Sequence, residues 1–87
     1  MPSLAGRITV HGSKPARTAT VELHNATGDV VDQVQTDDDG RFTFHLVAGK
    51  WSARVWDEHG HRGRAEFELS DEDHELNLDL EEPEGGH

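Results

Sequence analysis

Histidine is the side chain with the greatest capacity for chemistry in this sequence, because the chain has seven histidines and no cysteine. His59 and His61 flank Gly60 in a predicted hairpin loop, and two imidazoles placed in this way can bind zinc or copper. A metal needs a third or fourth ligand, and the candidates by residue type are Asp57, Glu58 and His74. Because these residues form no recognised metal signature, the sequence predicts no metal site and no cofactor. His24 and His45 fall on outward strand positions, so we expect the histidines to be mainly surface residues.

A tryptophan is predicted on the outer surface of the strand 51–56. Alternation within this strand places Trp56 on the face opposite its apolar residues. The candidate interaction patch consists of Trp56, Arg54, His59 and His61. An exposed indole beside polar groups is suited to docking a protein or stacking on a sugar. Alternation indicates only which face of a regular strand a residue occupies. A kink in the strand would instead turn Trp56 under the loop 58–62, so both interpretations stay open.

The acidic run Asp37-Asp38-Asp39-Gly40 also has two interpretations. Asp side chains can accept backbone N–H groups within a tight turn, and Gly40 tolerates a conformation that a side chain resists. The rival interpretation is a calcium loop, which needs alternate oxygen ligands and a distal bidentate carboxylate. No such carboxylate is apparent, so the sequence favours a structural turn.

Alternation of apolar and polar residues with a period of two runs through the chain and predicts strands. The seven predicted strands are 7–11, 19–24, 30–36, 41–46, 51–56, 64–69 and 75–80. Clusters of Gly, Asp, Asn, Ser and Pro separate them, and these residues favour chain reversal. Seven short strands that share one apolar inner set predict an all-β sandwich of two antiparallel sheets.

The pattern also predicts the core and the limits of the domain. Seven large side chains on the apolar parity are expected to be deeply buried: Phe42, Phe44, Trp51, Val55, Phe67, Leu76 and Leu78. The sandwich is expected to span residues 5–80. Residues 81–87 have no apolar anchor and are predicted to be an acidic, flexible tail.

Charge excludes several classes of function. Eight Lys and Arg against 18 Asp and Glu give a net charge of −10, and all nine charged residues from Glu68 onward are acids. Nucleic-acid or anionic-membrane binding needs a basic surface, so neither is expected. No signal peptide and no long apolar span are visible, so we expect a cytoplasmic protein, although a fragment of a surface protein would look the same.

Three motifs resemble carboxypeptidase regulatory-like domains and their Cna B-type relatives, which are prealbumin-like sandwiches. The segment Thr36–Phe44 is similar to the family's T-D-x-D-G-x-F-x-F turn, and 49–55 to its G-x-Y-x-L-x-V strand, with Trp51 in the tyrosine place. Residues 6–10, with 15–16 and 19–23, look like its opening segment. The resemblance implies a seven-stranded Greek-key fold of prealbumin or immunoglobulin-like type.

The resemblance also raises two activities that the residues disfavour. Some Cna B-type domains form a Lys–Asn cross-link, but Lys14 and Lys50 lie in predicted turns and Asn77 faces outward. Transthyretin-like 5-hydroxyisourate hydrolases use histidines and an arginine, which invites comparison with His11 and Arg41. This chain lacks the closing Tyr-Arg-Gly-Ser segment of those enzymes, so no catalytic residues are expected.

We therefore expect a non-catalytic accessory or interaction module that acts through another protein. A homo-oligomer through a free sheet edge is an open possibility. A carbohydrate-binding module that uses Trp56 is the alternative.

Overall fold

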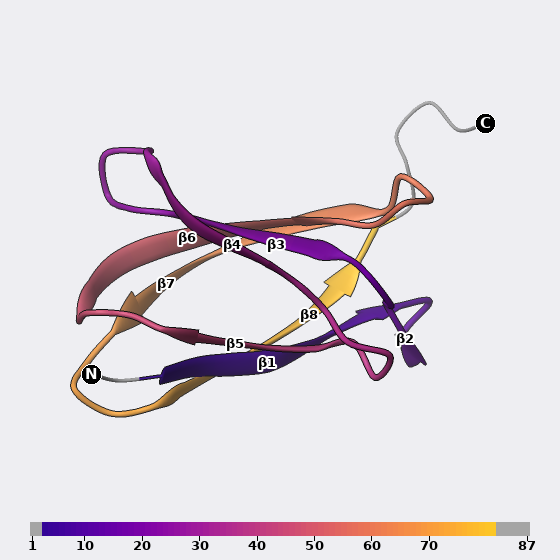
Figure 1. The fold of residues 1–87 in the computed structure, drawn as a ribbon, viewed down its shortest axis with the longest axis horizontal. Helices are drawn as coiled ribbons and strands as arrows, with labels where there is room; N and C mark the ends of the chain where they lie inside the picture. Colours follow the sequence, from indigo (N-terminus) through magenta and orange to yellow (C-terminus); the bar gives the residue numbers. More distant parts are fainter. Residues whose placement is uncertain (1–2, 82–87) are drawn as a thin grey trace.

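The computed structural model describes residues 3–81. Within this range eight strands form two stacked sheets, and there is no helix (Figure 1). The strands are β1 (Ser3–Val10), β2 (Lys14–Pro15), β3 (Thr20–His24), β4 (Val30–Gln35), β5 (Arg41–His45), β6 (Gly49–Trp56), β7 (Arg62–Leu69) and β8 (His74–Leu80). The predicted all-β Greek-key sandwich is confirmed. No helix long and apolar enough to cross a membrane occurs in the described residues.

The first sheet is built around β1. One edge of β1 pairs along its length with β8, and the other pairs with β5 and then β2. The second sheet has the order β4-β3-β6-β7, and every pair in it is antiparallel.

Two details of the first sheet differ from the prediction. The short strand β2 is additional, because the turn after β1 folds Lys14–Pro15 back onto Thr9 and Val10. The pair β1–β8 is parallel, because β8 enters the first sheet by crossing from β7 in the other sheet rather than through a hairpin.

The core lies between the sheets and is formed by alternate residues of the strands. Phe42, Phe44 and Val55 are 4%, 3% and 1% exposed, so their predicted deep burial is confirmed. The prediction of deep burial is wrong for the other four residues, which are only partly buried where they pack against the core: Trp51, Phe67, Leu76 and Leu78. Phe67 lies on β7 and both leucines lie on β8. Each of these is an edge strand of its sheet, with a neighbouring strand along one side only. Trp51 stands directly opposite Phe67 beside that edge.

Three loops share one hydrogen-bond design, in the segments 25–29, 37–41 and 57–61. In each, the first N–H donates to the carbonyl of the fifth residue, and a glycine in fourth place donates to the carbonyl of the first. The Oδ1 atom of the first Asn or Asp accepts the N–H groups of the third and fifth residues. The glycines have φ angles of 78° to 89°, which side chains resist. Turn formation by these clusters is thus confirmed in detail.

The middle loop also packs closely against β1 of the first sheet. Gly40 has a φ of 78°, and a Cβ atom on it would overlap the carbonyl oxygen of Ile8 in β1. The Gly40 carbonyl accepts the N–H of Ile8 at 2.7 Å. The backbone N–H of Arg41 is the main cause that holds the pKa of Asp37 below its ordinary value. Burial opposes this effect, and the N–H of Asp39 lowers the pKa further.

The two ends of the described chain are both attached to the sandwich. The Ser3 N–H donates to Asp73 Oδ1 at 3.0 Å, and this bond is the main cause of a lowered pKa for Asp73. Glu81, which the sequence assigned to the tail, exchanges two backbone hydrogen bonds with Arg62. The remainder of the predicted tail, residues 82–87, lies outside the described residues.

Candidate functional site

Four side chains form a two-by-two block on the outer surface of the second sheet. Trp56 and Arg54 lie two residues apart on β6, and Arg62 and Arg64 stand directly opposite them on β7. We call these four residues the arginine–tryptophan face. Residues two apart on a strand are separated by about 6.6 Å, and directly opposed Cβ atoms by about 5 Å, so the four side chains are close neighbours.

Alternation along the hairpin explains why these side chains point outward. Ala53 and Val55 on β6 are buried in the core, which directs Arg54 and Trp56 to the other face. On β7, Gly63 packs its backbone against the side chains of Leu78 and Leu80, which directs Arg62 and Arg64 outward. The loop 57–61 sets the register that brings the two pairs together.

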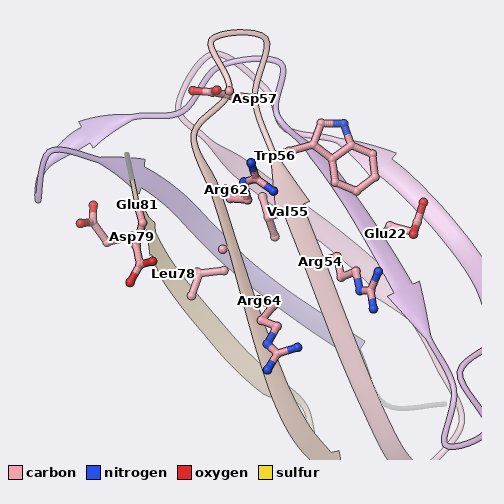
Figure 2. Close-up of a pocket in the computed structure, with 12 residues that line it drawn as sticks. Glu22, Arg54, Val55, Trp56, Asp57, Arg62, Arg64, Leu78, Asp79 and Glu81 are labelled. Carbon is pink, nitrogen blue, oxygen red and sulfur yellow. The ribbon is translucent and has the colours of Figure 1, made fainter. Parts of the chain in front are cut away.

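The arginine–tryptophan face lines an open depression of about 1010 Å³, which extends around the β7 edge toward the end of β8. Figure 2 shows the indole and the guanidinium groups on one side of β7, while the carboxylates of Asp79 and Glu81 lie on the other side and point away. Trp56 is 40% exposed, and all three arginines are exposed. The alternative in which Trp56 folds under the loop is therefore not the one that the structure adopts.

The three guanidinium groups have no counter-ion in the part of the chain that the structure describes. The ion pairs there join Arg17 to Asp38, His24 to Glu22, His59 to Glu58 and His61 to Asp57. Arg54 and Arg64 stand opposite each other, and like charges in this relation destabilise a sheet. Three of the chain's eight basic residues are thus gathered here without an ion pair to any residue of 3–81.

The acid closest to this block, Glu22, is committed elsewhere. Glu22 stands opposite Arg54, yet its Oε1 atom lies 2.7 Å from Nε2 of His24. Nδ1 of His24 lies 3.2 Å from the Gly28 carbonyl oxygen. His24 is only 8% exposed, which corrects its assignment as a surface histidine, because it is enclosed between Glu22 and the loop 25–29.

The structure divides the predicted patch between two places. Trp56 and Arg54 belong to the arginine–tryptophan face, whereas His59 and His61 line a separate depression of about 420 Å³ beside the β1–β2 turn. Nδ1 of His61 lies 2.8 Å from Oδ2 of Asp57, and the His61 ring lies 5.4 Å from that of His11. Among residues 3–81, no group of three or more His, Asp or Glu side chains is arranged to hold a metal ion.

The acidic turn has the geometry of a structural loop. Oδ1 of Asp37 accepts the N–H groups of Asp39 and Arg41 at 2.9 Å each, and all three aspartates are exposed. Oδ1 of Asp37 is thus the acceptor that holds the turn.

The residues that these two related activities would use have other contacts or lie apart in the described part of the chain. The Asn77 side chain accepts the Arg7 N–H and donates to Glu75, while both lysines are exposed. Arg41 stands opposite Arg7 on β1, whereas His11 lies in the turn that follows β1.

The sequence interpretation missed Arg62 and Arg64 as site residues. The signal was present, because the alternation of Ala65, Phe67 and Leu69 already placed Arg64 outward. What was missing was the pairing of β6 with β7, which the Asp-x-x-Gly hairpin in 57–61 indicates.

Comparisons with known proteins agree with this architecture. Residues 3–81 match the family model described as carboxypeptidase regulatory-like domain. No curated protein matches this chain significantly in sequence.

Similar solved structures include a Klebsiella pneumoniae 5-hydroxyisourate hydrolase, with a TM-score of 0.72 and 24% identity over 90% of this chain and 89% of that one. A DUF3823 family protein from Parabacteroides merdae has a TM-score of 0.70 and 19% identity, over 91% of this chain and 45% of that one. The Bacillus anthracis TIE protein has a TM-score of 0.72 and 19% identity, over 91% of this chain and 17% of that one. The chain thus spans less than half of the last two, and these likenesses show the fold alone. The family match covers the whole described sandwich, and the chain belongs to the carboxypeptidase regulatory-like domain family.

Proposed function

We propose that this domain is a non-catalytic interaction module that docks a partner protein on the arginine–tryptophan face. One observation carries the proposal: an exposed indole adjoins three guanidinium groups that have no counter-ion among the described residues. Trp and Arg are the residue types that most often dominate the energy of protein interfaces.

The cost of the arrangement supports a functional role. The Arg54–Arg64 opposition reduces the stability of the sheet, and an acid at position 64 would remove that penalty. Local features that lower stability without a structural gain are typical of sites kept for function. A bound partner would supply the missing counter-charges and cover the indole.

Self-association through a sheet edge has less support. One edge of the second sheet is β4, whose ladder with β3 contains a bulge next to Leu23. Asp32 stands opposite the buried Leu23 and so falls on the inward parity of β4. A bulge and an inward charge are both features that discourage edge-to-edge pairing.

A neutral glycan is the alternative occupant, since Trp56 could stack on a sugar ring. Guanidinium groups supply donors and positive charge but no acceptor, whereas sugar hydroxyls need both kinds of partner. The chemistry of the face therefore favours an anionic protein surface over a neutral sugar.

Site-specific photo-cross-linking tests the proposal. A benzophenone amino acid is introduced at Ser52, next to Arg54 on β6, or at Thr43, an exposed position on the first sheet. After irradiation in extract of the source organism, we expect an adduct of defined mass from position 52 and none from 43. The adduct should disappear when Trp56→Ala is added. Equal adducts from both positions, or an adduct that is indifferent to Trp56→Ala, would contradict the proposal.

A further inference from the structure

We infer that the partner segment which occupies the arginine–tryptophan face is an extended, acidic stretch of protein with carboxylates at alternate residues. The inference rests on the proposed docking function and adds the chemistry of the partner. It follows from the spacing of the charges, from their number and from the position of the indole.

The spacing of the guanidinium groups matches an extended chain. Arg62 and Arg64 are two residues apart on β7, and so are separated by about 6.6 Å. Alternate side chains of an extended peptide are separated by the same distance and point to the same side. A segment that lies along β7 can therefore present one carboxylate to each arginine. A helix would present neighbouring carboxylates three or four residues apart instead.

Arginine is well suited to this contact because its planar guanidinium group binds a carboxylate through two parallel hydrogen bonds. The side chains of Arg54, Arg62 and Arg64 make no hydrogen bond or ion pair with the rest of the described chain. Their donors are thus available to a ligand. Glu22, the acid opposite Arg54, has its Oε1 atom 2.7 Å from Nε2 of His24 rather than on a guanidinium group.

The number of charges separates a protein segment from a nucleic acid. A polyanion that extends beyond three arginines would meet a protein with a net charge of −10. Nucleic-acid affinity depends on neutralising many phosphates on a broad basic surface, which this face lacks. A short acidic segment needs only the three charges that the face offers.

Trp56 adds a direction to the proposed contact. It stands opposite Arg62, at the end of β6 next to the loop 57–61. A segment whose carboxylates meet Arg64 and then Arg62 has the indole, which is 40% exposed, beside it at the level of Arg62. We therefore place an apolar residue of the partner at that end of the segment.

Binding of fluorescent octapeptides to the full chain tests the inference. The first peptide has glutamate at every second position and threonine between, the second has the same composition with the four glutamates contiguous, and the third replaces glutamate by glutamine. Measured by anisotropy at low ionic strength, the alternating peptide should bind at least about threefold more tightly than the contiguous one. The glutamine peptide should not bind, and added salt should weaken binding of the alternating peptide, because exposed ion pairs are screened.

Charge reversal identifies the residues responsible. Arg54→Glu combined with Arg64→Glu should weaken the alternating peptide by at least about tenfold, the loss expected from about 1.4 kcal/mol. Arg41→Glu combined with Arg17→Glu has the same change in net charge but lies elsewhere, and should change affinity less than about twofold. The folded fraction of each variant is checked by circular dichroism, so that loss of binding is separated from unfolding.

Three results would overturn the inference. Equal binding of the glutamate and glutamine peptides, together with a cross-link at position 52, would leave the docking face in place but exclude an acidic partner. Tighter peptide binding after deletion of residues 82–87, which contain Glu82 and Glu84, would assign the face to the chain's own C-terminus. Self-association that Arg54→Glu abolishes, seen by sedimentation, would assign the face to a second copy.

Discussion

Replacement of Arg64 by glutamate should stabilise this domain, although it adds negative charge to a chain that is already strongly acidic. Arg64 stands directly opposite Arg54, so the variant exchanges a like-charge pair for an opposite-charge pair. Along β7 its outward neighbours, Arg62 and Glu66, carry opposite charges, so their effects on position 64 largely cancel. The changed pairing with Arg54 therefore determines that the variant gains stability.

The expected magnitude follows from cross-strand pairs in other sheets. Removing a like-charge opposition and creating an opposite-charge pair each contribute about 0.2–1 kcal/mol, so Arg64→Glu should gain about 1 kcal/mol. In a domain of this length, about 1 kcal/mol raises the Tm by roughly 4–8 °C. Arg64→Gln removes the repulsion alone and should give about half of the gain.

Lys50→Glu is the matched control, because Lys50 stands opposite Glu68 in the same pair of strands. Both variants change the net charge from −10 to −12, since a base is lost and an acid gained. Their cross-strand neighbours have opposite charges, so Lys50→Glu should lower the Tm while Arg64→Glu raises it.

Thermal unfolding followed by circular dichroism gives both values in one assay, and the difference should shrink at high salt. If Arg64→Glu lowers the Tm as much as Lys50→Glu does, then Arg54 and Arg64 do not repel each other. The argument that the face is maintained at a cost to stability would then fail.

Four further predictions concern the fold. Phe44→Ala should lower the free energy of unfolding by about 3–5 kcal/mol in urea titrations, because it removes a ring that is 3% exposed; a loss below about 1 kcal/mol would contradict the core. Gly40→Ala should cost more than about 2 kcal/mol in the same assay, whereas Gly28→Ala should cost only about 1 kcal/mol. Both glycines have positive φ, but only Gly40 has a backbone atom in the way, so equal losses would refute this reasoning. Because the pKa of Asp37 is lowered in the folded state, its contribution to stability is present above pH 3.8 and is lost as the pH falls through the folded pKa. Asp37→Asn should therefore flatten the fall of Tm below that pH, and an unchanged slope would count against it. Addition of a chelator should leave the Tm unchanged, and a drop of several degrees would reveal a metal that stabilises the fold.

The fold could be predicted from sequence because its signals are local. Alternation gives the inward face of each strand, and the Asx-x-x-Gly clusters give the reversals between strands. Burial of Phe42 and Phe44 follows from these two signals alone. Neither signal gives the position of a strand within its sheet. Phe67 and Leu78 are only half-buried because their strands lie at sheet edges.

The candidate site was harder to predict for the same reason. Outward parity identified Trp56 and Arg54, but the residues that complete the block lie on the neighbouring strand. The histidines His59 and His61 were grouped with Trp56 because they are close in sequence. The hairpin loop turns the His61 ring toward Asp57 and into another depression, which sequence distance does not reveal.

Nuclear magnetic resonance of the labelled protein tests the central claim most directly, because the two tryptophans report on different surfaces. The alternating glutamate peptide is titrated while the indole N–H signals of Trp56 and Trp51 and the Nε–H signals of the arginines are followed. The Trp51 indole donates to the Val47 carbonyl at 3.0 Å and lies outside the arginine–tryptophan face. We predict saturable shifts of Trp56, Arg54 and the two β7 arginines, with Trp51 and Arg41 unchanged. Shifts confined to other surfaces, or no saturable shift at the face, would contradict the account.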